Sequence, residues 1–140
     1  MAFTGNWTTN AFKTGLMDGT FNFTSGSFYL ALYTNSATLD ATTTAYTATG
    51  EASGGNYVAG GNLLTIAQVP TVGNGDTAFI SFNNTSWTGA ITARGALIYL
   101  SGGGNPAVCV LDFGADKTST ATFTVQFPAV TNTSAIIRIS

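Results

Sequence analysis

The chain has 140 residues, of which 7% are charged, with four Lys and Arg against six Asp and Glu and a formal net charge of −2. This is the length of one ordinary domain with a hydrophobic core of its own, so we expect a single unit over residues 1–140. A weakly negative chain has no basic field to attract nucleic acid or an anionic membrane, and direct binding to either is not expected.

The polar residues are mostly Thr, Ser, Asn and Gly rather than Lys and Glu. Burying a hydroxyl or an amide costs less free energy than burying an unpaired charge, so such a surface suits contacts between protein subunits. A soluble secreted β domain is the alternative that composition leaves open. The start, MAFTGNWTTN, lacks the basic and apolar regions of a signal peptide, and we expect synthesis and folding in a cytoplasm.

The N-terminal segment, residues 1–24, carries the helical pattern of the chain. Within TTNAFKTGLMDG, Phe12 and Leu16 lie four residues apart on one face, and Thr9 or Asn10 is available as the N-cap. The stretch ends in a glycine, which is a typical residue after the last helical turn. We expect two or three turns of helix that persist by packing against a sheet or a neighbour.

From residue 28 onward the pattern changes to a period of two. The stretch FYLALYT is apolar or aromatic on both faces, as expected for a strand inside a sandwich or beneath an interface. Further strands, separated by turn residues, are predicted at 63–69, 77–83, 95–100, 107–113, 120–127 and 135–139. This series predicts an all-β fold, an antiparallel β-sandwich or jelly roll with one short N-terminal helix.

The long segment 34–62 separates the first two predicted strands. Short edge strands around 45–47 and 57–59 are one interpretation, and an extended arm that orders only against a partner is another. A turn-rich connection within the domain is the plainer interpretation, and a partly ordered loop at a subunit contact is the functional one.

The stretch TGEASGGNYVAGGNLLT, residues 49–65, is rich in glycine but lacks the features of a phosphate loop. Such a loop needs its glycines and a lysine between a strand and a helix, whereas here a strand follows and no lysine is near. We expect these glycines to supply positive φ angles and close backbone approach in turns.

The chain contains no histidine, which removes the commonest general base and metal ligand. The letters DFG at 112–114 lack the rest of a kinase signature. We interpret Asp112, Asp116 and Lys117 as forming a surface ion pair rather than a cation site, and Cys109, between two valines, as a small buried apolar residue. We therefore expect no catalytic, cofactor or metal site, and no enzymatic activity.

Three parts of the sequence carry a resemblance: AFKTGLMDGTFNF, then LALYTNSATLDATTTAYTATGEASGGNYVAGGNLLT, then ARGALIYL with AVCVLDFGADKTSTATFTVQFP. Together they cover nearly the whole chain, which resembles a family of small virion proteins of tailed bacteriophages. The sequence departs from the family pattern in its low lysine content and in lacking a His before the Phe of the early helical segment. The most specific matches are Ala31 to Leu39, Thr47 or Thr49, Glu51, Ser53, Gly54, Tyr57, Gly60, Gly61 and Leu64.

The resemblance implies a β-rich structural component of the particle and not a catalyst. We expect a capsid decoration (cement) protein, a homotrimer seated on the outer shell of the virion, with the major capsid protein and other copies of itself as partners. Because large aromatic side chains anchor interfaces, the candidate contact residues are Phe3, Trp7, Phe12, Tyr46 and Tyr57. Core packing is the competing interpretation, above all for Phe12, and Trp7 is the first choice.

Two alternatives are open at this stage. The same fold would serve as a phage tail component, such as a fibre, an adaptor or a tube-associated protein. A carbohydrate-binding β-sandwich would instead use Trp7, Tyr57 or Trp87 as a stacking platform for sugars.

Overall fold

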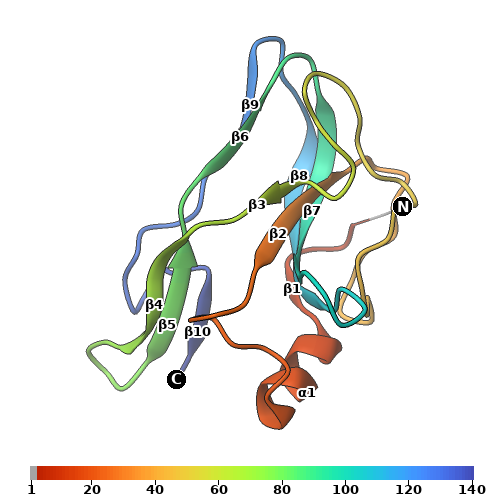
Figure 1. Ribbon diagram of the computed structural model, residues 1–140. Coiled ribbons are helices and arrows are strands. Elements are labelled where there is room, and N and C mark those ends of the chain that lie inside the picture. The colour runs from red at the N-terminus through yellow and green to blue at the C-terminus, as the bar shows by residue number, and fades with distance from the viewer. Residues whose placement is uncertain (1–2) are drawn as a thin grey trace.

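The structure, a computed structural model that describes residues 3–140, is an all-β fold with one short helix, as the sequence predicts (Figure 1). The first two residues of the expected 1–24 segment lie outside the described residues. One layer is a five-stranded antiparallel sheet in the order β1-β8-β7-β2-β3. Its strands are β1 (Trp7–Thr8), β8 (Ala107–Thr118), β7 (Thr92–Leu100), β2 (Phe28–Tyr33) and β3 (Asn62–Leu63).

The second layer consists of two smaller antiparallel sheets. A three-stranded sheet has the order β10-β5-β4, and a two-stranded sheet pairs β6 with β9. Figure 1 shows β6 and β9 rising above β5 and β4 while β10 lies beside β5 near the C-terminus. The strands are β4 (Ile66–Val72), β5 (Ala78–Phe82), β6 (Thr85–Thr88), β9 (Thr122–Val125) and β10 (Ile137–Ile139).

Strand β2 shows why the five-stranded sheet has two apolar faces. Its even-numbered residues, Phe28, Leu30 and Leu32, lie in the core between the two layers, together with residues of β5, β6 and β9. The alternate residues Ala31 and Tyr33 point to the opposite face, where a second buried cluster forms. The prediction that both faces of this strand meet apolar neighbours is confirmed, as side chains alternate across a strand.

The second cluster is covered by chain that belongs to no sheet. Phe3 forms an isolated bridge with Leu39, and both are 1% exposed. Ala37 is buried beside them, and Tyr46 packs on the cluster from the same segment. Segment 34–62 therefore packs on its own sheet, which favours the interpretation as a connection within the domain. A role of this segment at a subunit contact stays a prediction.

The helix α1 (Asn10–Asp18) begins and ends as predicted. The Thr9 hydroxyl accepts from the Phe12 N–H, and Gly19 takes the left-handed conformation after the last turn. Gly15 lies against Phe21, and a Cβ at this glycine would be 2.3 Å from the Phe21 ring. The helix thus packs through a glycine, although glycine lowers the intrinsic helix propensity of the segment.

Every predicted strand is observed, with shifted ends, but two observed strands, β1 and β6, were not predicted. The run 63–69 is divided between β3 and β4, and β8 continues five residues past the predicted end at 113. Strand β6 was missed because its sequence, TSWT, reads as a polar turn, whereas its partner β9 supplies the pairing. Of the short strands expected within 34–62, the structure shows isolated bridges at Ala45 and Glu51 and a turn at Tyr57.

Candidate functional site

A dense cluster of hydrogen bonds lies beside β2, around Glu51, which forms a bridge with Tyr33. Glu51 Oε1 accepts from the Tyr46 hydroxyl at 2.6 Å, while Oε2 accepts from the Tyr57 hydroxyl at 2.6 Å and from the Gly60 N–H at 2.7 Å. The Tyr57 oxygen in turn accepts from the Leu32 N–H of β2 at 2.9 Å. One carboxylate thus joins three points of the long segment and, through a tyrosine, the sheet.

All five tyrosines of the chain belong to this region. The Tyr33 hydroxyl donates to the Thr47 carbonyl at 2.7 Å, and that of Tyr99 donates to the Gly60 carbonyl at 2.6 Å. The ring of Tyr99 lies between those of Tyr29 and Tyr46, with centroids 5.9 and 4.9 Å away. The rings and hydroxyls together fix segment 34–62 on the sheet.

Burial raises the pKa of four of these phenols, and the nearby Glu51 carboxylate raises it further. The pKa of Tyr99 rises to about 12, and those of Tyr33, Tyr46 and Tyr57 rise as well. A phenol whose pKa is raised keeps its proton at neutral pH and acts as a hydrogen-bond donor rather than a base. The arrangement is that of a polar network which stabilises the fold.

The glycines of segment 34–62 supply positive φ angles and close backbone approach, as the sequence predicts. Gly61 has a φ of 81°, and a Cβ there would lie 1.8 Å from the Leu30 carbonyl oxygen. Gly55 has a φ of 51°, and its Cβ would meet the Thr88 carbonyl at 2.1 Å. These positions let the backbone of the long segment pass directly over β2 and β6.

The structure separates the five candidate contact residues into three groups. Phe3 is 1% exposed and Phe12 is 2% exposed, so neither offers a surface to a partner, and for these two the prediction is corrected to core packing. Tyr46 and Tyr57 are half-buried in the Glu51 network. Trp7 is 40% exposed on the edge strand β1, where its indole N–H donates to the Thr4 hydroxyl at 3.1 Å.

Side-chain pairing and burial decide two other interpretations of the sequence, those of Asp112 and Trp87. Asp112 pairs with Arg94, at 3.0 Å, and not with Lys117. The Arg94 guanidinium and the Gly114 N–H help to hold the pKa of Asp112 below its usual range against the opposing effect of desolvation. Trp87 is 2% exposed and packs against Tyr57, so its ring has no free face for a sugar.

Cys109 is buried, as expected, and desolvation raises the pKa of its thiol to about 12. Within residues 3–140, no group of three or more Cys, Asp or Glu side chains is placed to hold a metal ion. In the same residues, no helix is long and apolar enough to cross a membrane.

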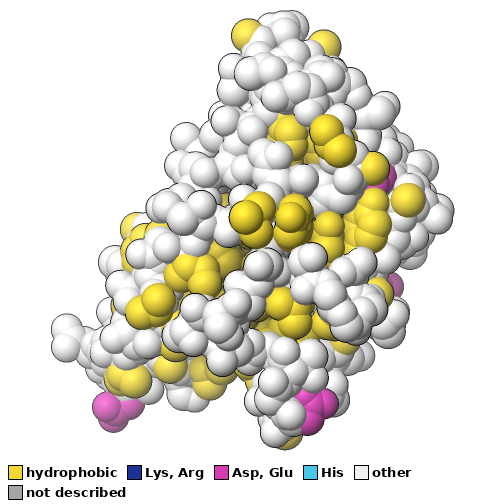
Figure 2. Space-filling model, viewed as in Figure 1, with side chains coloured by type: hydrophobic (Ala, Val, Ile, Leu, Met, Phe, Trp, Pro, Cys, Tyr) yellow, Lys and Arg dark blue, Asp and Glu magenta, His cyan; other side chains and the backbone are white. Residues whose placement is uncertain are grey.

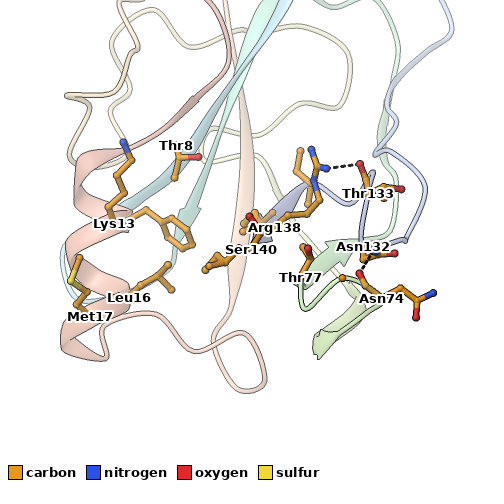
Figure 3. Close-up of a pocket in the computed structure, with 15 residues that line it drawn as sticks. Thr8, Lys13, Leu16, Met17, Asn74, Thr77, Asn132, Thr133, Arg138 and Ser140 are labelled. Carbon is orange, nitrogen blue, oxygen red and sulfur yellow. Dashed lines mark hydrogen bonds between the residues drawn. The ribbon is translucent and has the colours of Figure 1, made fainter.

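The largest cleft lies elsewhere, between α1 and the C-terminal strand β10 (Figure 3). It has a volume of about 1120 Å³. Lys13, Leu16 and Met17 of α1 line one wall, and Arg138 and its neighbours in β10 line the other. The β4–β5 turn and the loop before β10 close one end, where the Asn132 amide donates to the Asn74 carbonyl.

A smaller apolar pocket of about 370 Å³ continues from this cleft. The two spaces share four lining residues: Phe12, Leu16, Ile137 and Ile139. The open space between α1 and the three-stranded sheet therefore extends along both sides of β10. Met17 is 86% exposed and Ile139 is 54% exposed at the mouth of the cleft. This is the part of the molecule where large apolar side chains and open space occur together.

Exposed apolar side chains also occur along β3 and β4. Figure 2 shows yellow hydrophobic groups separated by uncharged white surface, with magenta acidic groups only near the margins of this face. Leu63 is 56% exposed, and Val69 and Val72 are 51% and 65% exposed. Sequence reasoning singled out aromatic residues as contacts and missed these aliphatic ones, because the sequence does not show which strands lie at the sheet edges.

Comparison with protein-family models, with curated proteins and with solved structures found no match for the chain. Function therefore has to be argued from the geometry described above and from the sequence itself.

Proposed function

We propose that the chain is a structural virion protein, a capsid decoration (cement) protein that binds the outer shell of a tailed bacteriophage and stabilises it. The observation that carries the proposal is the exposure of large aliphatic side chains on a surface with few charges. The residues concerned are Met17, Val58, Leu63, Val69, Val72 and Ile139.

The edges of the sheets support the same proposal. Strands β1 and β3 bound the five-stranded sheet, and β4 and β10 bound the three-stranded sheet. Soluble monomers commonly protect such edges with lysine or other charged residues, because unpaired backbone groups bind other strands. No lysine lies in any of these four strands, and Arg138 is their one charged residue. What protects these edges instead is the short length of β1, β3 and β10 and, in β4, Pro70 and two register shifts. The low charge at the edges suits contacts with other protein subunits.

The resemblance of the sequence to small virion proteins of tailed phages adds independent support. Its most specific residues include Glu51, Tyr57, Gly60 and Gly61, which meet in one network that fixes the long segment to the sheet. These residues of the resemblance therefore act by stabilising the fold. The contact surface lies apart from it, on the sheet edges and on α1.

The proposal is tested by the copy number of the protein in purified particles and by the heat tolerance of those particles. A shell protein is present in many copies, and particles that lack it should assemble but release their DNA at a lower temperature, because each copy adds buried contact between neighbouring subunits. Adding the purified protein back to the deficient particles should restore the original temperature.

The outcomes distinguish the competing locations. A low copy number would place the same protein in the tail. Equal heat tolerance with and without the protein, at high occupancy, would contradict a stabilising role. Absence from the particle altogether would contradict the proposal as a whole.

A further inference from the structure

We propose that the cleft between α1 and β10 binds an extended segment of a partner protein, rich in alternating acidic and apolar residues, which adds to the edge of β10 as a further strand. The inference rests on the proposed function in that the partner is taken to be a subunit of the particle. It names the site and the chemistry of the segment that enters it.

The first argument is the open backbone of β10. This strand pairs with β5 through Ile137, Arg138 and Ile139, and it stands at the end of its sheet. Within residues 3–140, no backbone hydrogen bond joins these three residues to any element other than β5. Figure 1 shows β10 between β5 and the side of the molecule that carries α1, so its free edge faces the cleft. An added strand is the partner that satisfies a row of N–H and C=O groups of this kind.

The second argument is the apolar lining on both walls. Leu16 and Met17 project from α1, and Ile136, Ile137 and Ile139 line the opposite side. Alternate side chains of an added strand point to opposite faces, so one set would enter this apolar space while the other set faced solvent. The unbranched Met17 side chain adapts its shape to such a ligand.

The third argument is charge, which selects an acidic segment. Lys13 and Arg138 stand on opposite walls of the cleft, and no acidic side chain lines it (Figure 3). The acidic residues next to lining residues, Asp18 and Asp76, do not line the cleft. The ion pair described within residues 3–140 is that of Arg94 with Asp112, so neither cation of the cleft has a carboxylate partner there.

A cationic cleft is unusual in this chain. It holds two of the four Lys and Arg residues of a protein whose net charge is −2. Both cations are exposed, so carboxylates on a docked segment would act mainly on partner choice and on the association rate. Electrostatic complementarity therefore favours an acidic segment over a basic one.

The experiment uses the whole protein and two short synthetic peptides, one of alternating valine and glutamate and one of alternating valine and lysine. Binding is followed by NMR through the backbone amide signals of the protein. The valine–glutamate peptide should shift the signals of residues 136–140 and of α1, and the valine–lysine peptide should bind on the order of tenfold more weakly. Methylating alternate backbone nitrogens of the peptide should abolish binding, because the added strand then loses its hydrogen bonds.

Charge reversal provides the matched control. The double variant Lys13→Glu with Arg138→Glu should invert the preference between the two peptides, and Lys117→Glu, which changes a cation outside the cleft, should leave it unchanged. All three side chains are exposed, so the variants are expected to fold. Amide signals that stay dispersed in each variant verify this directly.

Results that differ from those expected for the two peptides and the variants contradict the inference. Equal binding of the two peptides would remove the role of charge, and shifts confined to residues outside α1 and β10 would move the site. No binding of either peptide would overturn strand addition at β10. If the protein were nevertheless abundant in heat-stabilised particles, the decoration function would stand while this site failed.

Discussion

The two faces of the molecule differ in how their polar and apolar groups are used. Beside β2 of the five-stranded sheet, Glu51 accepts three hydrogen bonds and segment 34–62 lies fixed over buried tyrosines. On the opposite side, α1 and β10 stand apart, with Met17 and Ile139 exposed and Lys13 and Arg138 without an ion pair among residues 3–140. The hydrogen bonds of the first region are made within the chain, whereas the second is the region that we propose a partner to cover. The difference indicates that substitutions around Glu51 should impair folding and those around the cleft should impair docking.

The largest expected effect is that of Gly61→Ala. The new Cβ would lie 1.8 Å from the Leu30 carbonyl oxygen, at a φ of 81°. Clash and left-handed strain together should lower the free energy of unfolding by about 4 kcal/mol. Gly102→Ala is the matched control, because Gly102 also has a positive φ but nothing lies within 4 Å of its Cβ position. Urea denaturation should show a loss of about 1 kcal/mol for the control, and equal losses for both variants would refute the close packing.

Glu51→Ala should have the next largest effect on folding. It leaves the hydroxyls of Tyr46 and Tyr57 and the Gly60 N–H without their acceptor. Unsatisfied groups in a half-buried network should lower the free energy of unfolding by about 3 kcal/mol. Asp116→Ala removes an exposed carboxylate and should change it by less than about 0.5 kcal/mol. The assigned role of Glu51 fails if calorimetry gives the two variants the same melting temperature.

Alkaline pH should weaken the tyrosine side of the molecule further. The pKa of Tyr99 is about 12 in the folded chain because of burial and the Glu51 carboxylate, against about 10 when unfolded. The unfolded state therefore releases its proton first, and the free energy of unfolding should fall as pH rises from about 10 to about 12. Tyr33, Tyr46 and Tyr57 act in the same direction, and Cys109 extends the effect to slightly lower pH.

Urea titrations at a series of pH values measure this dependence. Tyr99→Phe removes one of the phenols and should flatten the decline, whatever its effect at neutral pH. Stability that is constant up to pH 12 would mean that the tyrosines are ionised as readily in the fold as outside it.

The smallest effect on folding is expected at the cleft. Met17→Ser and Ile139→Thr change exposed side chains and should alter the free energy of unfolding by less than about 0.5 kcal/mol each. Together they should reduce the occupancy of the protein on particles, because the docking surface loses apolar area. Val130→Thr alters an exposed side chain outside the cleft and outside the contact residues named above, and it serves as the control. Unchanged occupancy in the first pair would move the docking surface away from the cleft.

The sequence predicts what depends on local pattern. The N-cap at Thr9 or Asn10, Gly19 as the helix end, and the two apolar faces of β2 all follow from spacing and residue type, and the structure selects Thr9 as the N-cap. The Glu51 network was not predicted, because hydroxyl and carboxylate groups a few residues apart meet only when glycines fold the chain back over β2. The cleft was not predicted either, because its walls come from opposite ends of the chain.

The choice of aromatic contact residues shows the same limit. Phe3 and Phe12 lie outside the predicted strands and for that reason resemble surface anchors, but tertiary packing buries both. Burial depends on which segments cover which face, and no local pattern states that Phe3 pairs with Leu39. Trp7 is exposed, and its contact with a partner stays a prediction.

Amide hydrogen exchange, measured on the free protein and on the protein bound to purified particles, tests the central claim most directly. Binding should slow exchange in β10 and along α1, where a partner segment supplies new hydrogen bonds and cover. It should leave residues 51–61 unchanged, since their hydrogen bonds are already made within the chain. Protection that appears around Glu51 and leaves Ile137–Ile139 unaffected would contradict the assignment of the two regions.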